Sequence, residues 1–518
     1  SLVYMAPVMQ RQEVVLLGFS LFILLWVGCC VGNDSVKFSD SVRDCVAEQG
    51  CTGRFWIYFT DKGHHLLSPD ELQDLKTSIY DSIHPNSHKR RTKRTSEEVA
   101  LDEKDFPVFA AYIEQISLLP GVRHSKTSKW LNSISVTLEN DRILDIIAEF
   151  SFVKEIDVVR RYKRSPYLPT QKIVEVKSLE NTMNYQYDGD LHYGESYEQL
   201  EVLGVPSLHL EGLTGHGVVV LILDSGFNLE HPAIRSMDIA NQHDFVSDDD
   251  DVSDQNSDEI GSSDPEKHGT ATLSTVGGID DGKHYGPAFG ATFLLGKTES
   301  MLIEDPIEED YFIAAVEWGE ELGTDVITAS LGYQDWYSYN DKDGSSLIDR
   351  TIDIAVEDRG IVVVVSVGNE HTHNLGPGVP GDALRALSIG ATYLDGDITY
   401  FSSQGPTIDG RYKPELSAPG YSIHVANWNW DAATEEDYVT MSGTSFSCPL
   451  AAGVVALLLE SHPEWRPNDV HSALMTTASQ ASNPDNVYGW GVINATAANN
   501  YQVPSNPSHE HGVCDDFE

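Results

Sequence analysis

The sequence predicts an α/β protein whose larger part is a parallel β-sheet covered by helices on both faces. The apolar runs of this part are short and unbroken rather than alternating, which is typical of strands that are buried on both faces. Helical stretches at residues 311–322 and 346–357 lie between these runs, and such an order indicates a parallel sheet. The predicted strands are residues 218–223, 292–295, 326–327, 361–367 and 387–389.

A smaller α/β domain is expected upstream, because strand-like and helix-like patterns alternate there as well. We predict strands at residues 55–59, 134–138 and 156–159, and helices at residues 106–118 and 143–150. Basic residues 89–94 are expected in a solvated loop. A second basic stretch, residues 160–164, closes the domain, and a polar, tyrosine-rich linker is expected to run from there to about Tyr197.

The beginning of the chain is typical of an exported protein. Arg11 precedes an apolar run over residues 14–27, which is shorter than the about 20 residues of a membrane span. We therefore expect a secretory signal at residues 1–32, an extracellular location and no stable membrane insertion. The Gly28-Cys29 junction also fits a lipid anchor at Cys29, although Trp26 stands where such motifs carry an aliphatic residue.

The charge is concentrated in the larger domain. From Glu201 onward the chain has 52 acidic and 11 basic residues. The formal net charge of the whole chain is -46. Such a field disfavours nucleic acid and anionic membranes as partners and favours solubility. Adaptation to salt-rich surroundings and an ordinary acidic secreted protein both agree with it.

The six cysteines do not form a dense disulfide framework. Cys45 and Cys51 are near enough in sequence to close a small loop after export. Cys448 lies in an apolar helical pattern and is expected to be a small buried residue. We assign no function to Cys514 or to the tail around His509, Glu510 and His511, because a few ligands at a chain end are weak support for a metal site.

Three short blocks offer an acid, a base and a nucleophile in a fixed order. Asp224 directly follows a predicted strand, where the sites of parallel sheets lie. His268 begins a helix-like stretch, and Ser445 begins the apolar helix over residues 446–460. Taken singly, these residues are typical of a turn, a surface position and a helix cap. Their order, with a glycine within two residues of each, points instead to activated-nucleophile chemistry.

With these blocks the sequence resembles the subtilisin-like serine proteases, the subtilases, whose triad follows the same Asp, His, Ser order. The similarity extends over about residues 200–499, with Asp224, His268 and Ser445 at the positions of the triad. It implies a signal at residues 1–32, an inhibitory propeptide and linker at 33–186, a peptidase domain at 187–500 and a tail at 501–518. Processing is expected within residues 160–197.

The resemblance also implies an oxyanion hole and a substrate-binding segment. Asn369 follows a strand-like run and corresponds to the family's oxyanion asparagine, with Gly368 beside it. Ser330, Leu331 and Gly332 resemble the extended segment that pairs with substrate backbone. Glu370 either lies near the specificity pocket, where it would favour a basic or polar residue, or is a solvated acid of a very acidic domain.

Two features depart from the family or add to it. Phe446 follows the nucleophile where many relatives have methionine, so we expect better tolerance of peroxide. Residues 247–258 form an acidic insertion that lacks the spacing of a calcium loop, and we expect a solvated loop. A structural Ca²⁺ is therefore unsupported, no other metal site is expected, and the chemistry requires no cofactor.

The sequence thus predicts a secreted serine endopeptidase that is made as a zymogen and processes itself. Its partners would be protein or peptide substrates and its own propeptide, which acts as an intramolecular inhibitor. Two alternatives from other classes remain: a catalytically silent module that binds peptides in the same cleft, and an acidic cation-binding surface protein. The first alternative requires no reaction at Ser445, and the second predicts stability that depends on Ca²⁺.

Overall fold

The structure is a computed structural model. It describes residues 37–39, 42–43, 53–94, 101–159, 191–253, 266–299, 306–333, 337–371, 376–430 and 437–504. The expected signal, Cys29, the Cys45 and Cys51 pair, the stretch 160–190 and the tail from residue 505 lie outside the described residues.

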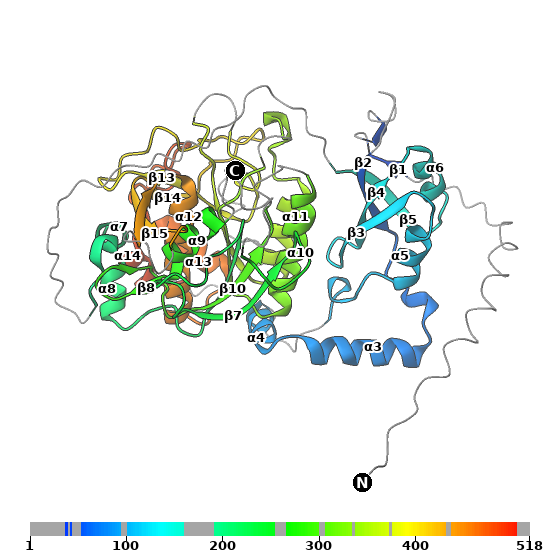
Figure 1. Cartoon of the computed structure of the whole chain (residues 1–518), viewed down its shortest axis with the longest axis horizontal. Coiled ribbons are helices and arrows are strands. Elements are labelled where there is room, and N and C mark those ends of the chain that lie inside the picture. Colours follow the sequence, from blue (N-terminus) through cyan, green and yellow to red (C-terminus); the bar gives the residue numbers. More distant parts are fainter. Residues whose placement is uncertain are drawn as a thin grey trace, which may run out of the picture.

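Seven parallel strands form the larger sheet, in the order β14-β13-β12-β11-β6-β10-β7 (Figure 1). Their bounds are β6 Val219–Asp224, β7 Asp238–Asp244, β10 Thr292–Lys297, β11 Val326–Ala329, β12 Val362–Ser366, β13 Leu387–Thr392 and β14 Leu416–Pro419. Every neighbouring pair is parallel. The predicted fold class is therefore confirmed, and the unbroken apolar runs are the central strands of this sheet.

Helices cover both faces of this sheet, and single strands serve two cores. In β6, Val220 and Ile222 face one core, whereas Leu221 and Leu223 face the other. This side-chain alternation explains why the strand is apolar at every position. The first core contains α7 (Tyr197–Glu201), α8 (Val205–Leu210), α9 (Glu266–Gly277), α12 (Thr444–Ser461), α13 (Pro467–Thr477) and α14 (Ala495–Asn499). The second contains α10 (Ile307–Glu321), α11 (Leu347–Asp353) and the π turn η5 (Ile354–Asp358).

Helix α12 runs through the middle of the first core. By length and composition it is apolar enough to cross a membrane, but 83% of its apolar window is buried inside the protein. It carries Cys448, which is fully buried and unpaired, as the sequence predicts. Burial raises the pKa of the Cys448 thiol to about 12, so this thiol stays protonated at neutral pH.

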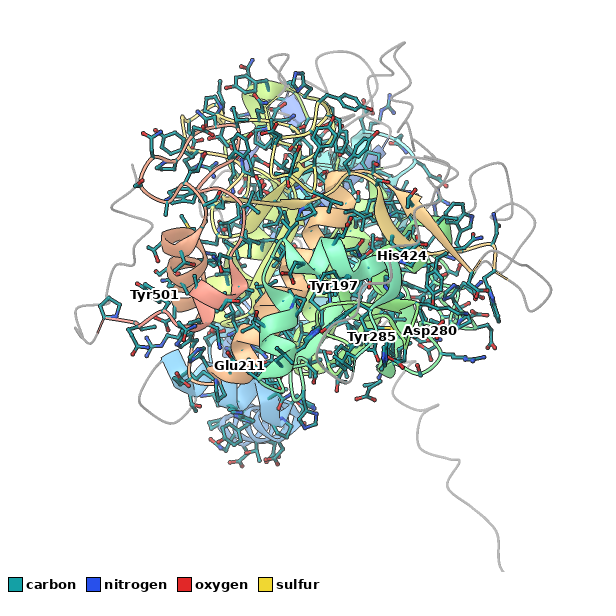
Figure 2. All side chains as sticks on the ribbon, turned by 90° about the vertical axis from the view of Figure 1, so that its left-hand side faces the viewer. Tyr197, Glu211, Asp280, Tyr285, His424 and Tyr501 are labelled. Atoms are coloured by element: carbon teal, nitrogen blue, oxygen red, sulfur yellow. The ribbon has the colours of Figure 1, made fainter. Side chains whose placement is uncertain are left out.

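Short elements complete the larger domain. They are η3 (Gly194–Ser196), η4 (Tyr339–Asp341) and two hairpins, β8 (Ile279–Asp280) with β9 (His284–Tyr285) and β15 (Ile423–Ala426) with β16 (Tyr438–Met441). Figure 2 views the side of the molecule where Asp280, Tyr285 and His424 of these hairpins lie. The expectation of a linker up to Tyr197 is wrong at its end, because Tyr193 is 3% exposed and packs in the first core.

The smaller domain is a five-stranded sheet in the order β1-β5-β2-β4-β3. Its elements are β1 Lys37–Phe38, β2 Gly53–Phe59, α5 Ala110–Ser117, β3 Val122–Ser128, β4 Ser133–Leu138, α6 Arg142–Ala148 and β5 Val153–Val158. Strand β2 again serves two sides. Phe55, Ile57 and Phe59 pack in the domain's own core with α5 and α6, as alternate positions of a strand must.

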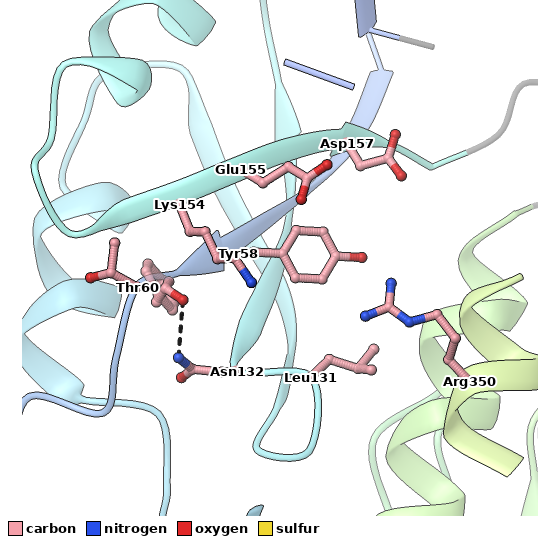
Figure 3. Close-up of a pocket in the computed structure, with 9 residues that line it drawn as sticks. Tyr58, Thr60, Leu131, Asn132, Lys154, Glu155, Asp157 and Arg350 are labelled. Carbon is pink, nitrogen blue, oxygen red and sulfur yellow. Dashed lines mark hydrogen bonds between the residues drawn. The ribbon is translucent and has the colours of Figure 1, made fainter. Parts of the chain in front are cut away.

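The other face of this small sheet docks on the larger domain. Trp56 and Tyr58 of β2 form one buried cluster with Ile313 of α10, and the partly buried Ile354 of η5 packs against it. Beside this contact lies a cavity of about 240 Å³, into which Arg350 of α11 points toward Tyr58 (Figure 3). The Arg350 guanidinium is 5.9 Å from the centre of the Tyr58 ring. The docked face is thus apolar at its centre and polar at its edge.

Between β2 and α5 the chain makes an arm of helices that the sequence did not predict. It comprises η1 (His64–Leu66), α3 (Pro69–Ser82), α4 (Pro85–Arg94) and η2 (Glu103–Asp105). The expectation that residues 89–94 form a solvated loop is wrong, because they belong to α4 and both Arg90 and Arg91 are buried. Two of their acidic partners, Glu320 and Asp325, lie more than 200 residues away, whereas Asp105, which pairs with Arg91 at 2.8 Å, lies 14 residues away in η2.

Candidate active site

The candidate acid is the last residue of strand β6. Asp224 is fully buried, and its Oδ1 accepts hydrogen bonds from the backbone N–H of Ser225 at 2.8 Å and from the Ser225 hydroxyl at 3.2 Å. Strand β6 lies between β10 and β11, so its end is at the centre of the sheet's carboxyl edge. This edge is where parallel sheets place their sites.

Helix α9 brings the candidate base onto this carboxylate. His268 Nδ1 lies 2.8 Å from Asp224 Oδ1, and the Thr272 hydroxyl, one turn later in α9, donates to Asp224 Oδ2 at 2.9 Å. Residues four apart share one face of a helix, so a single carboxylate receives both groups. The sequence placed His268 at the start of its helix, whereas α9 begins two residues earlier.

The surroundings of His268 favour its charged form. Burial alone would lower its pKa, but the negative charge of Asp224 and the hydrogen bond to it outweigh burial, so the pKa of His268 is raised. The Asp224 carboxylate can only accept a hydrogen bond, so Nδ1 of the neutral His268 ring carries the proton that is donated to it. Nε2 of the neutral ring is then free to take a proton.

The candidate nucleophile lies in the first turn of α12. Ser445 is 7% exposed, and its hydroxyl lies 3.4 Å from the carbonyl oxygen of Ser330, to which it donates. No hydrogen bond joins Ser445 Oγ and His268 among the residues that the structure describes. The Phe446 ring, next in the chain, is centred 6.0 Å from the His268 ring, so base and nucleophile come from adjoining elements. Catalytic hydrogen bonds are often long until substrate binds.

Asn369 lies beside the start of α12. Its Oδ1 accepts hydrogen bonds from the Thr444 backbone N–H at 2.9 Å and from the Thr444 hydroxyl at 3.0 Å. This leaves the Asn369 Nδ2 group on the side of Gly443, where a β-carbon would lie 3.7 Å from it. The same β-carbon would lie 3.7 Å from the backbone N of Ser445, so this nitrogen and the Asn369 amide lie on the same side of Gly443. The first N–H groups of a helix have no partner inside the helix.

The predicted substrate segment continues strand β11 at the same edge. The Ser330 hydroxyl donates to the Ser445 carbonyl at 2.8 Å, and the Leu331 carbonyl accepts from Ser366 at 3.3 Å. Gly332 follows them. Gly368 has a φ of 108°, which favours glycine, and its carbonyl accepts from the backbone of Ser403. Of the predicted substrate-binding residues, Ser330 is therefore the one that hydrogen-bonds to the candidate nucleophile among the contacts described.

Two models of known protein families match this chain. The model of the subtilase family, Peptidase S8, matches residues 215–491, and that of the peptidase S8 propeptide domain of Bacteroidota matches residues 54–173. The chain belongs to the subtilase family. It is a subtilisin-like serine endopeptidase with an N-terminal propeptide, and the small domain is that propeptide.

Alignments with individual relatives cover more than half of this chain. Serine protease AprX of Bacillus subtilis is 29% identical over 311 residues, which are 55% of this chain and 66% of AprX. Subtilisin of Bacillus pumilus is 30% identical over 300 residues, which are 57% of this chain and 94% of that protein. Fervidolysin from Fervidobacterium pennivorans, described as a keratinolytic enzyme related to subtilisin, has a TM-score of 0.57 at 19% identity. This alignment covers 91% of this chain and 64% of fervidolysin, and it supports the fold.

Two residues of the subtilase site were missed by sequence reasoning. Thr272 binds Asp224, and its spacing of four from His268 is a signal that a helical reading of α9 offers. Thr444 binds Asn369, for which the sequence gives no signal, because the two residues are 75 positions apart. Glu370 is half-buried and accepts a hydrogen bond from Ser403 at 2.9 Å, so it is not a freely solvated acid.

The acidic insertion is described only in part. Asp248, Asp249 and Asp250 are exposed, in agreement with a solvated loop, whereas residues 254–258 lie outside the described residues. Among the residues that are described, no three His, Cys, Asp or Glu side chains gather as a metal site would need. The expectation of chemistry without a cofactor stays a prediction.

Proposed function

We propose that this subtilase is an extracellular zymogen that cuts off its own propeptide and then hydrolyses protein or peptide substrates with Ser445, His268 and Asp224. The observation that carries the proposal is the 2.8 Å contact between His268 Nδ1 and Asp224 Oδ1. It supports a neutral imidazole whose free nitrogen, Nε2, is the one that a general base needs.

In the proposed reaction the Ser445 hydroxyl attacks the peptide carbonyl while His268 Nε2 takes its proton. Asp224 keeps the imidazole in the required tautomer and stabilises the imidazolium that forms. His268 then gives the proton to the leaving amine, which departs, and an acyl-enzyme at Ser445 remains. Water hydrolyses that ester with His268 again as the base.

The negative oxygen of the tetrahedral intermediate would be bound by two donors, the Asn369 amide and the Ser445 backbone N–H. Support comes from Thr444, whose two hydrogen bonds to Asn369 Oδ1 keep the amide from turning over. Donors that are fixed before the reaction cost no reorganisation when charge develops. The positive end of α12 favours the same charge.

Substrate backbone would add as a strand along Ser330, Leu331 and Gly332. Main-chain hydrogen bonds then supply affinity, and side-chain pockets supply preference. The propeptide that docks on α10 and α11 would inhibit the enzyme, and the chain would be cut within residues 160–197. An extracellular location is proposed from the apolar start of the chain and from the subtilisin relatives.

Labelling with a fluorophosphonate probe tests this function, because the probe reacts only with an activated serine. We expect labelling of the processed protein, none of the Ser445→Ala variant, and undiminished labelling of Ser447→Ala. Ser447 is a buried serine two residues further along α12 and serves as the matched control. Labelling that survives Ser445→Ala would refute the assignment, and an unlabelled wild type would favour the silent peptide-binding alternative.

A further inference from the structure

The arm of the propeptide reaches the catalytic domain at a place of its own. Helix α3 has no buried residue and is stabilised by its own cap, in which Ser68 and Glu71 exchange hydrogen bonds. Its 14 residues span about 21 Å at 1.5 Å per residue. Figure 1 shows α3 extending from the small domain to α4, which lies at the end of α10. Helix α3 therefore acts as a spacer that delivers α4.

Helix α4 is attached by two buried arginines. Arg90 and Arg91 are 4% and 7% exposed. Arg91 Nη2 lies 2.8 Å from Glu320 Oε1, and Arg90 Nε donates to the Arg359 carbonyl at 2.7 Å. Burial alone would raise the pKa of Glu320, but Arg91, Arg90 and Arg359 outweigh it and lower this pKa, so the carboxylate is charged.

Two glycines of the catalytic domain leave room for the propeptide arm. Gly323 and Gly360 follow the ends of α10 and η5 with φ of +88° and +71°. A β-carbon on Gly323 would lie 2.1 Å from the His84 ring, and one on Gly360 would lie 3.2 Å from Arg90 Cγ. Between them, the Ser87 hydroxyl donates to the Glu320 carbonyl at 2.7 Å. Carbonyls at helix ends carry partial negative charge and favour a basic segment.

Charges cross this contact in both directions. Arg359 belongs to the catalytic domain and is 2% exposed, and it donates to both carboxylate oxygens of Asp102 in the propeptide at 2.8 and 2.9 Å. Lys104 of the propeptide pairs with Asp358 at 2.9 Å. Separating α4 and its neighbours from the catalytic domain would break these ion pairs together, and both members of each pair would have to be hydrated again.

The contact lies at the amino ends of the strands of the large sheet, whereas the candidate active site lies at their carboxyl ends. Asp325 directly precedes β11 and lies 3.5 Å from Arg90, whereas Ser330 directly follows β11. Asp325 also accepts the N–H of Val219 at the start of β6, whose other end is Asp224. Substrate would thus bind at the carboxyl ends of these strands, whereas α4 binds at their amino ends.

We propose that Glu320, Gly323, Asp325, Arg359 and Gly360 form a second propeptide-binding site, the α4 seat, and that α4 holds the cleaved propeptide on the enzyme through it. The proposal rests on the proposed function. Two separate contacts joined by one chain bind bivalently. When one contact opens, the other keeps the propeptide close to the enzyme, so the open contact forms again. Activity then appears only after α4 has left its seat. The partner that fits the seat is a basic helical segment.

The first test uses the full chain with Arg91→Met, and Lys89→Met as the matched control, because Lys89 is an exposed residue of the same helix. After self-cleavage, size-exclusion chromatography measures how much propeptide elutes with the catalytic domain, and a chromogenic peptide measures the lag before activity. We expect Arg91→Met to shorten the lag at least tenfold and to lose co-elution, with Lys89→Met within about twofold of wild type. Propeptide that leaves Arg91→Met at the wild-type rate would overturn the proposal.

A second test does not require protease activity. In the uncut Ser445→Ala chain, hydrogen exchange is expected to be slow for the α4 amides and fast for those of exposed α3. Equal, fast exchange of the two helices would overturn the proposal even if the protease function holds. Slow exchange of α4 together with a wild-type chain that stays uncut would instead keep the seat and count against the protease function. Glu320→Gln, from the other side of the contact, is expected to speed the α4 exchange, whereas unchanged exchange contradicts the assigned pairing.

Discussion

Thr272 Oγ1 donates to Asp224 Oδ2 at 2.9 Å, one helical turn after His268, whose Nδ1 lies 2.8 Å from Oδ1 of the same carboxylate. Helix α9 therefore binds both oxygens of Asp224. The hydroxyl draws charge from the carboxylate and fixes its plane, so it acts on His268 through Asp224. Thr272 is a positioning residue in this account.

Replacing Thr272 by valine should change the pH profile of the protease. A carboxylate that loses a donor stabilises the imidazolium more strongly, so the pKa of His268 rises further. We expect the acid limb of kcat/KM to move up by as much as about one pH unit and the plateau to fall about threefold to tenfold. Thr272→Ser should restore both values.

The matched control is Thr275→Val, which removes a buried hydroxyl from the same helix that binds only the Ala271 carbonyl. The plateau of kcat/KM could instead fall equally in Thr272→Val and Thr275→Val while both acid limbs stay in place. That result would mean that the role of Thr272 is purely structural.

Removing the Asn369 amide should lower kcat with little change in KM. The expected loss for Asn369→Ala is about 10²–10³, a range known from subtilisin itself. Thr444→Val removes one of the two hydrogen bonds to Asn369 Oδ1 and keeps the backbone one, so its loss should be smaller. Steady-state kinetics with a peptide substrate measures both. A loss that appears in KM alone would contradict the oxyanion role.

His471 should make the fold sensitive to acid. Burial, with Lys413 and Arg385 as further causes, lowers its pKa to about 3, whereas the unfolded chain takes the proton near pH 6.5. The unfolded state therefore binds more protons below pH 6.5, and stability falls as the pH drops from there toward 3. At pH 5 the loss from this group is about 2 kcal/mol.

Urea unfolding in the Ser445→Ala background measures this term without self-digestion. We expect His471→Leu to reduce the stability lost between pH 7.5 and pH 5 by about 2 kcal/mol, while His216→Leu, at an exposed position, leaves it unchanged. Parallel pH curves for His471→Leu and its parent would rule out the neutral buried histidine.

Phe446 should protect the site from oxidation. Its side chain is 2% exposed and its ring lies next to that of His268, so a sulfoxide at this position would disturb the base. We expect Phe446→Met to lose activity in peroxide faster than wild type. Equal inactivation of the two proteins would sink this prediction.

The sequence predicted what depends on local patterns. The strands around Asp224 and Asn369 could be recognised because burial on both faces leaves an unbroken apolar run, and the family resemblance named the site residues. The contacts of Thr444 with Asn369 and of Arg91 with Glu320 could not be recognised, because 75 and 229 residues separate the partners. Basic residues in a row are usually solvated, and only the carboxylates brought by folding make their burial favourable.

The most direct test of the central claim is N-terminal sequencing of the purified wild type and of Ser445→Ala. The account predicts a new N-terminus within residues 160–197 in wild type and an uncut propeptide in Ser445→Ala. The same new terminus in both proteins, or an uncut chain in both, would contradict a zymogen that processes itself through Ser445.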